Sequence, residues 1–144
     1  MASRDSTTNW KGGLNSGTGV VTLDSSGSAR FEVTFPRRIG EPEGTTSPEE
    51  LIAAAQSSCL AMNLAGTLEK EGLTPNTIDV SARVTVGPSN GGLSIDTVAI
   101  TLSAEVAGVD EDTFARLAQQ AKDTCPVSNA LAGTTITLDA RLAG

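Results

Sequence analysis

The stretch at residues 47–72 constrains the fold of this chain more than any other part of it. No charged side chain occurs from residue 51 to residue 68, and small or apolar residues stand on nearly every face that a helix of this sequence would present. A helix that is apolar all round is normally buried on all sides. We therefore expect a long buried helix at the centre of the fold, with one thiol, Cys59, at its middle.

The two ends of this helix are marked by capping residues. Ser47 can accept a hydrogen bond from the first turn, and Pro48 suits the first helical position because its missing N–H would be unpaired there. Glu50 completes a capping box with Ser47, and Glu49 also lies at the positive end of the helix dipole. Gly72 predicts the end of the helix.

Length and composition predict one domain that needs a partner. A chain of 144 residues is most simply a single domain, residues 1–144. With one tryptophan, three phenylalanines and no tyrosine, its core must be built from alanine, valine, leucine and isoleucine. A helix that is apolar all round needs more cover than one sheet of so small a domain provides. We therefore expect an obligate oligomer, a homodimer with a shared core.

The charge balance argues against two classes of partner. The formal net charge is −7, whereas nucleic acids and anionic membranes both favour a basic face, so we expect neither as a partner. The sequence shows no apolar run of membrane-spanning length and no signal-peptide core, which predicts a cytoplasmic protein. In that compartment two cysteines are not expected to form a structural disulfide.

The sequence contains no histidine. This absence excludes Ser-His-Asp triads, Cys-His proteases and imidazole acid–base catalysis. Two thiols without imidazole are also too few for a closed zinc site, so we expect no metal. Chemistry by the chain alone is then left to thiolate, carboxylate, lysine and arginine side chains.

Several segments have the pattern of strands. A β-prone piece at 17–22 precedes residues 28–35, where apolar and polar side chains alternate as in a half-buried strand. Residues 78–86 alternate in the same way, and a hairpin connection follows at 87–92. The next strand changes phase part-way along its length, which indicates a β-bulge near residues 96–97.

The remaining segments complete an α+β pattern. A loop at 36–46 leads into the long helix, and Asp110 begins a second helix with an apolar stripe over residues 114–121. A short helix starts after Cys125, and a strand at 136–142 closes the chain. The order βββ–α–ββ–α–α–β predicts an α+β domain with a mainly antiparallel sheet packed on the long buried helix.

The two cysteines differ in their local setting. Cys59 lies at mid-helix, where no helix dipole stabilises a thiolate and a small buried thiol is typical of packing. A reactive Cys59 would need a cation from elsewhere in the fold. Cys125 falls at the N-cap of the short helix, ahead of Pro126, where free N–H groups favour a thiolate. Local reasoning therefore nominates Cys125 as the nucleophile. It leaves open that Cys59 is a packing residue and that the position of Cys125 could be filled by any small residue.

Three charged residues lie near the start of the long helix. Glu49 has a sufficient reason to be there as a first-turn helix residue. Arg37 and Arg38 are solvated loop charges by default. Their place just before the helix also makes them available to pair with Glu49 or to approach a thiolate.

Two segments each contain one of the cysteines in a distinctive setting: residues 44–59, GTTSPEELIAAAQSSC, and residues 121–131, AKDTCPVSNAL. They resemble the two cysteine motifs of the OsmC/Ohr family of bacterial organic hydroperoxide reductases. They occur in the order and spacing of the family, and the opening NWKG at 9–12 favours its OsmC branch. The resemblance covers nearly the whole chain and implies an OsmC/Ohr-like fold with an intertwined homodimer.

The resemblance implies a thiol peroxidase that uses neither metal nor flavin, and so no cofactor. Cys59 would attack the peroxide oxygen of an organic hydroperoxide, release an alcohol and become a sulfenic acid. Cys125 would then form a disulfide with Cys59, and a dithiol reductant, of the lipoyl type in the family, would open it. This order overrules the local nomination of Cys125.

In the same resemblance the catalytic carboxylate corresponds to Glu49 and the arginine to Arg38, with Arg37 left open because the loop is about one residue longer. On a straight helix, Glu49 and Cys59 are separated by about 15 Å of rise and roughly 80° of rotation, so they cannot touch within one helix. Either Glu49 supports Cys59 across a subunit interface, or the helix is interrupted before Cys59. The first option agrees with the expected homodimer.

Two other functions stay open. The same thiols could serve a peroxide sensor or a disulfide reductase, or they could be packing residues of a structural or ligand-binding dimer. Hydroperoxide consumption that depends on Cys59 distinguishes the peroxidase from the structural dimer.

Overall fold

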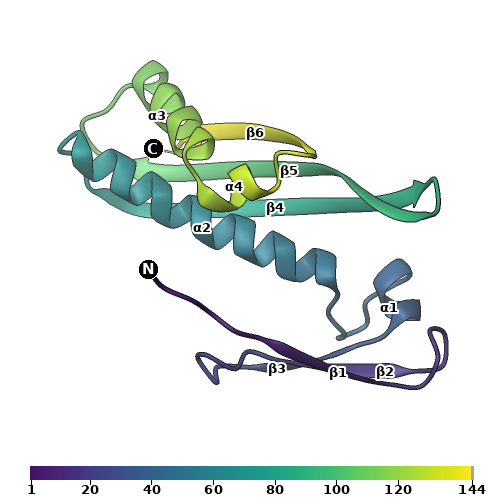
Figure 1. Ribbon diagram of the computed structural model, residues 1–144. Helices are drawn as coiled ribbons and strands as arrows, with labels where there is room; N and C mark the ends of the chain where they lie inside the picture. The colour runs from purple at the N-terminus through teal and green to yellow at the C-terminus, as the bar shows by residue number, and fades with distance from the viewer. Residues whose placement is uncertain (144) are drawn as a thin grey trace. The chain divides into compact units, whose positions relative to one another are not determined.

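A three-stranded antiparallel sheet opens the chain in the computed structural model, which describes residues 1–143. The middle strand pairs with both of its neighbours, and a short helix follows the third strand (Figure 1). These elements are β1 (Thr7–Lys11), β2 (Thr18–Thr22), β3 (Arg30–Val33) and α1 (Phe35–Ile39). They belong to the first of two compact units, residues 1–51, and the second unit begins at Ile52. The strands predicted at 17–22 and 28–35 are confirmed, the second with shorter bounds.

Helix α1 stands where the sequence predicted the beginning of a loop, so the predicted loop is wrong over these residues. Thr34 is the N-cap, and its hydroxyl accepts a hydrogen bond from the backbone N–H of Arg37 at 3.3 Å. Pro36 lies in the first turn, where its missing N–H costs nothing. A helix of five residues is too short for a periodic pattern, and only its cap signal marks it in the sequence.

Helix α2 (Pro48–Lys70) confirms the predicted long helix, and it is continuous. The Ser47 hydroxyl caps it by accepting from the backbone N–H of Glu50 at 3.1 Å. The second half of the predicted capping box does not form, because the Glu50 carboxylate instead accepts from the Thr46 hydroxyl. At the other end Gly72 adopts a φ of 74°, and the N–H of Leu73 bonds to the carbonyl of Leu68 at 3.0 Å, which is the glycine stop that the sequence predicts.

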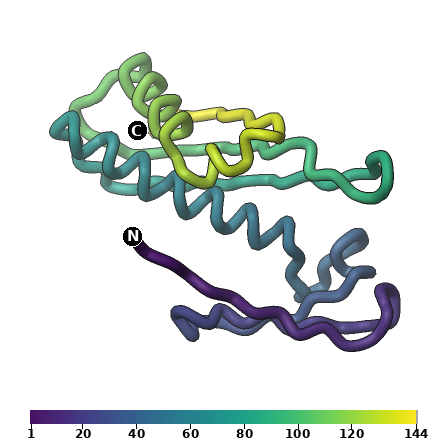
Figure 2. Tube along the Cα trace, in the orientation of Figure 1, coloured from purple at the N-terminus to yellow at the C-terminus, as the bar shows by residue number. Residues whose placement is uncertain are grey.

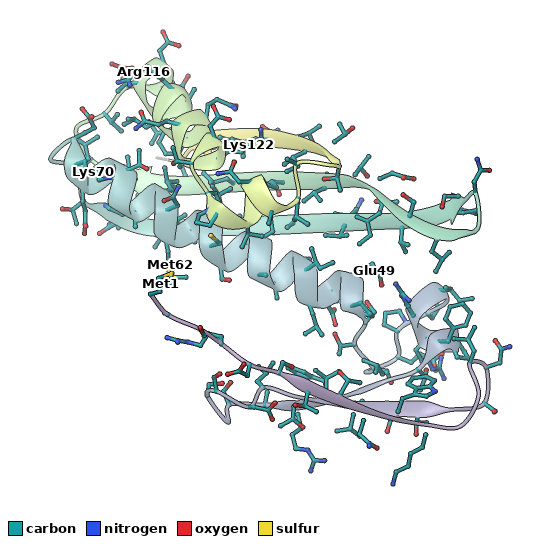
Figure 3. The ribbon with its side chains drawn as sticks, viewed as in Figure 1. Met1, Glu49, Met62, Lys70, Arg116 and Lys122 are labelled. Atoms are coloured by element: carbon teal, nitrogen blue, oxygen red, sulfur yellow. The ribbon has the colours of Figure 1, made fainter. Side chains whose placement is uncertain are left out.

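Within the single chain α2 is buried along one face rather than all round. Leu60, Leu64 and Leu68 are fully buried in the core of the second unit. The side chain of Met62 is 70% exposed, and Figure 3 shows it leaving the helix on the side away from Lys122. In the described part of the chain, α2 is the one helix long and apolar enough to cross a membrane by length and composition, so the expectation of no apolar run of that length is wrong. Its leucine face instead packs as a core helix does.

The second unit contains a separate sheet, so the single sheet expected from the sequence is in fact two. Its strands are β4 (Pro75–Ser89), β5 (Gly92–Val106) and β6 (Thr135–Leu142). β4 and β5 form a long antiparallel hairpin that extends beyond the end of β6 (Figure 2). β6 pairs with β5 in parallel, because the helical crossover between them returns the chain in the same direction.

The β4–β5 hairpin carries the irregularity that the sequence predicts. Pairing passes from Thr85 with Thr97 to Val86 with Ile95, so Asp96 is left over as a bulge. The predicted connection at 87–92 is wider than the observed one, since the strands continue to Ser89 and Gly92 and only two residues form the turn. The glycines and the proline in this segment led to a predicted loop that is too long, because strand pairing tolerates both residue types at the end of a hairpin.

Helices α3 (Glu111–Asp123) and α4 (Pro126–Ala130) lie with α2 against the sheet of the second unit (Figure 1). The Asp110 carboxylate caps α3 by accepting from the N–H of Thr113 at 2.7 Å, as predicted. The predicted apolar stripe of α3 is buried in the core cluster that also contains the leucines of α2 and the apolar side chains of β5; it consists of Phe114, Leu117, Ala118 and Ala121. This packing places the start of α4 beside the middle of α2.

Candidate active site

The fold of the second unit brings the two thiols together. Cys59 comes from the middle of α2, and Cys125 is the N-cap residue of α4. Their Sγ atoms are 3.1 Å apart, and both thiols are free. A disulfide requires about 2.05 Å between sulfurs, so the pair is about 1 Å from bonding distance. Cys125 is fully buried, whereas Cys59 is partly exposed.

The surroundings shift the pKa values of the two thiols in opposite directions. Burial raises the pKa of Cys59, and the backbone N–H of Val127 opposes this shift without cancelling it. Burial also acts to raise the pKa of Cys125, but hydrogen bonds led by the backbone N–H of Ser128 hold it below its ordinary value. Among the described groups that shift the pKa of Cys59, none is a cation. Within this unit the thiol at the helix start is therefore the more acidic one, as local reasoning from the N-cap position predicts.

A buried amide contacts Cys125 from α2. The Gln56 side chain is fully buried, and its Nε2 donates to Ser128 Oγ at 2.9 Å and to Cys125 Sγ at 3.8 Å. Ser128 belongs to α4 and is itself buried. Neither residue was singled out from the sequence.

A second amide holds the segment just before Cys125. Asn63 Nδ2 donates to the carbonyl of Ala121 at 2.6 Å and to the hydroxyl of Thr124 at 2.9 Å. Gln56, Cys59 and Asn63 follow one another at the spacing i, i+3, i+7, which places them on one face of α2. Two amides at this spacing from a cysteine, in a helix otherwise rich in alanine and leucine, are the signal that could have identified them.

The first unit contains an ion pair between two of the predicted site residues. Arg38 Nε lies 3.1 Å from both carboxylate oxygens of Glu49, and Arg38 Nη2 lies 2.7 Å from Glu49 Oε1. Glu49 is 6% exposed. Burial acts to raise the pKa of Glu49, but hydrogen bonds from Arg38 hold it below its ordinary value, and the same hydrogen bonds raise the pKa of Arg38. Both side chains are therefore charged at neutral pH, in a forked geometry that fixes the guanidinium plane.

Arg37 has a different partner from Arg38. Its Nη1 lies 2.6 Å from Glu43 Oε2, and both side chains are substantially exposed. Of the two arginines that the sequence left open, the structure therefore pairs Arg38 with Glu49.

An apolar pocket of about 240 Å³ adjoins this ion pair in the first unit. Its walls come from the first strand and the following loop, from the end of β3 and from the two helix starts; they are formed by Trp10, Leu14, Val33, Thr34, Phe35, Arg38 and Pro48. Arg38 is the one charged residue in that lining, so the pocket combines an apolar wall with a fixed cation.

Within residues 1–143, no group of three or more acidic, cysteine or histidine side chains is arranged to hold a metal ion.

Comparison with known proteins places the chain in a family. The profile of the OsmC-like protein family matches residues 40–139. The chain belongs to the OsmC-like family. It is 38% identical to the peroxiredoxin OsmC of Escherichia coli over 133 residues, with 92% of each chain covered. It is 32% identical to an organic hydroperoxide resistance protein of Xanthomonas axonopodis over 117 residues, covering 79% of this chain and 78% of the relative.

Solved structures show the same OsmC fold. An OsmC-like protein of Vibrio cholerae has a TM-score of 0.78 at 17% identity, with 98% of this chain and 100% of that chain covered. The expected family and the α+β fold class are thereby confirmed. The match to the OsmC profile spans Glu49, Cys59 and Cys125, whereas Arg38 lies just before it. Of the four predicted site residues, the structure brings together Cys59 with Cys125 in one unit and Arg38 with Glu49 in the other.

Proposed function

We propose that this OsmC-family protein is a thiol-dependent peroxidase that reduces organic hydroperoxides to alcohols. The observation that carries the proposal is the pair of free thiols with sulfurs 3.1 Å apart. Relatives named peroxiredoxin OsmC and organic hydroperoxide resistance protein, at 38% and 32% identity, support the same activity.

In the proposed reaction, the Cys59 thiolate attacks an oxygen of the hydroperoxide. A sulfur–oxygen bond forms and the oxygen–oxygen bond breaks, so the substrate leaves as an alcohol after taking up a proton, and Cys59 becomes a sulfenic acid. Cys125 then displaces the hydroxyl group and forms a disulfide with Cys59. A dithiol of the lipoyl type supplies the two electrons that restore both thiols.

The Arg38–Glu49 pair supplies the cation that Cys59 needs. The carboxylate orients the guanidinium, and a guanidinium beside the sulfur lowers the pKa of a thiol. α2 is continuous from Pro48 to Lys70, so its rise still separates Glu49 from Cys59 by about 15 Å. The two residues of one helix therefore cannot touch. We therefore assign Arg38 and Glu49 to Cys59 of the partner subunit in a cytoplasmic homodimer, which would also cover the exposed face around Met62.

Substrate preference tests the proposal in the unmodified protein. We expect kcat/KM for cumene hydroperoxide to exceed that for hydrogen peroxide by roughly ten- to sixtyfold, with reduced lipoamide as the dithiol. The apolar pocket beside Arg38 would hold the tail, and burying roughly 60–100 Å² of it gives about 1.5–2.5 kcal/mol. Equal values for the two peroxides would contradict an apolar substrate site.

Glu49→Gln should slow the oxidation of Cys59 by about ten- to a hundredfold. The substitution removes the charge that orients Arg38, and a charge-assisted hydrogen bond contributes about 1.5–3 kcal/mol. The measurement is the rate of sulfenic acid formation in a single turnover.

Glu50→Gln is the matched control for this prediction. It changes the adjacent carboxylate, which contacts the Thr46 hydroxyl at the start of α2. We expect its oxidation rate to stay within about twofold of the unmodified protein, because only a helix-end contact is altered. An equal loss of rate in both variants would count against the role of Glu49.

A further inference from the structure

Gln56 is a fully buried amide on α2. It precedes Cys59 by three residues on α2 and therefore lies on the same helix face. Its Nε2 donates to Ser128 Oγ at 2.9 Å and to Cys125 Sγ at 3.8 Å. Within the described residues its Oε1 is buried without a hydrogen-bond partner.

Core packing alone does not account for an amide at this position. A buried polar atom without a partner lowers stability, and nearly all such atoms in native proteins are paired. Methionine has a similar length and would fill the same space without an unpaired oxygen. The buried amide of Gln56 therefore needs a reason beyond packing, and its N–H group donates both to Ser128 and to the sulfur of Cys125.

The hydrogen bonds around Cys125 favour its charged form. The backbone N–H groups of Ser128 and Val127 lower its pKa, and the Gln56 amide adds a donor from α2. The thiolate is the nucleophile in disulfide formation, and the sulfur of Cys59 is 3.1 Å away.

We propose that Gln56 is a positioning residue for the resolving thiol: its buried amide donates a hydrogen bond to the Cys125 sulfur and holds it beside Cys59. This inference rests on the proposed function. In the step concerned, Cys125 donates an electron pair to the sulfur of the Cys59 sulfenic acid; the sulfur–sulfur bond forms and the sulfur–oxygen bond breaks. Hydroxide leaves and takes up a proton to become water. The hydroperoxide consumed in the preceding step is the oxidant.

Gln56→Met tests the proposal by separating two steps of a single turnover. Reduced protein is mixed with one equivalent of cumene hydroperoxide, and the sulfenic acid is trapped with dimedone and followed by mass spectrometry. We expect Cys59 oxidation to stay within about twofold of the unmodified protein, and disulfide formation to slow by about tenfold, as for the loss of one hydrogen bond to a charged group. The sulfenic acid then accumulates.

A second readout does not depend on the peroxidase reaction. In a Cys59→Ser background Cys125 is the remaining thiol, and its thiolate can be titrated by ultraviolet absorbance. Adding Gln56→Met should raise the pKa of Cys125, because removing a hydrogen-bond donor destabilises the thiolate more than the neutral thiol.

Thr67→Val is the matched control. Thr67 is 7% exposed on α2, and its hydroxyl donates to the carbonyl of Asn63 within the helix. We expect this variant to leave both steps and the pKa of Cys125 unchanged.

Three outcomes would overturn the inference. Disulfide formation at the unmodified rate, or an equal slowing of both steps in Gln56→Met, would leave Gln56 with a merely structural role. If the unmodified protein does not react with the hydroperoxide, the proposed function fails, and the Cys125 titration alone then decides the inference. An unchanged pKa in that titration would overturn it.

Discussion

A Cys59→Ser variant is expected to consume organic hydroperoxide no faster than buffer containing the dithiol alone. A serine hydroxyl is not ionised at neutral pH and cannot replace a thiolate as the nucleophile towards a peroxide oxygen. Removal of a nucleophile costs about a thousandfold or more in kcat in well-studied enzymes, so the loss should be complete within detection. The measurement is steady-state hydroperoxide consumption with reduced lipoamide.

Ser58→Ala controls for a change on the same turn of α2. The Ser58 hydroxyl is exposed and donates to the carbonyl of Ala54 at 2.7 Å within the helix. Removal of this hydroxyl should leave the rate of hydroperoxide consumption within about twofold of the unmodified protein. Steady-state turnover retained in Cys59→Ser would contradict the proposed mechanism, and a slow reaction with every peroxide that does not depend on Cys59 would instead favour a structural role for the cysteines.

A Cys125→Ser variant is expected to complete one turnover and then stop. Oxidation of Cys59 does not require Cys125, so one equivalent of alcohol should form for each chain. The sulfur that lies 3.1 Å from Cys59 is then missing, and the disulfide cannot form. The sulfenic acid should persist at Cys59, where dimedone adds to it stoichiometrically.

The contrast between the two cysteine variants defines the order of events. A burst of alcohol in Cys125→Ser, with none in Cys59→Ser, assigns the first attack to Cys59. The reverse pattern would reinstate Cys125, which has the lower pKa of the pair within the second unit. Sustained turnover of Cys125→Ser at the unmodified rate would mean that the dithiol attacks the sulfenic acid directly, and the disulfide would then be unnecessary.

Local structure could be predicted from the sequence wherever a few neighbouring residues decide it. The capped start of α2, its glycine stop at Gly72 and the Asp110 cap of α3 were predicted and are present. The apolar stripe of α3 and the bulge at Asp96 were also predicted, because periodicity of 3.6 or 2 residues reveals which face is buried. The N-cap position of Cys125 followed from Pro126 alone.

Other features needed the fold. Helix α1 was missed because five residues show no period, and the parallel pairing of β6 depends on a crossover that spans two helices. The partner of Glu49 could be either of two adjacent arginines in the sequence, and only the fold of helix α1 directs Arg38 to it and Arg37 to Glu43.

The long helix α2 shows which features the sequence determines and which depend on the tertiary structure. The sequence by itself determined that α2 forms, where it begins and ends, and that it carries Cys59, since helix formation and capping depend on residues within a few positions of one another. Tertiary structure decided what the thiol meets: Cys125 lies 66 residues away along the chain, and packing of α3 and α4 on the leucine face of α2 brings the sulfurs to 3.1 Å. It also decided which residues the Gln56 amide contacts, because its partners Ser128 and Cys125 lie 72 and 69 residues away along the chain.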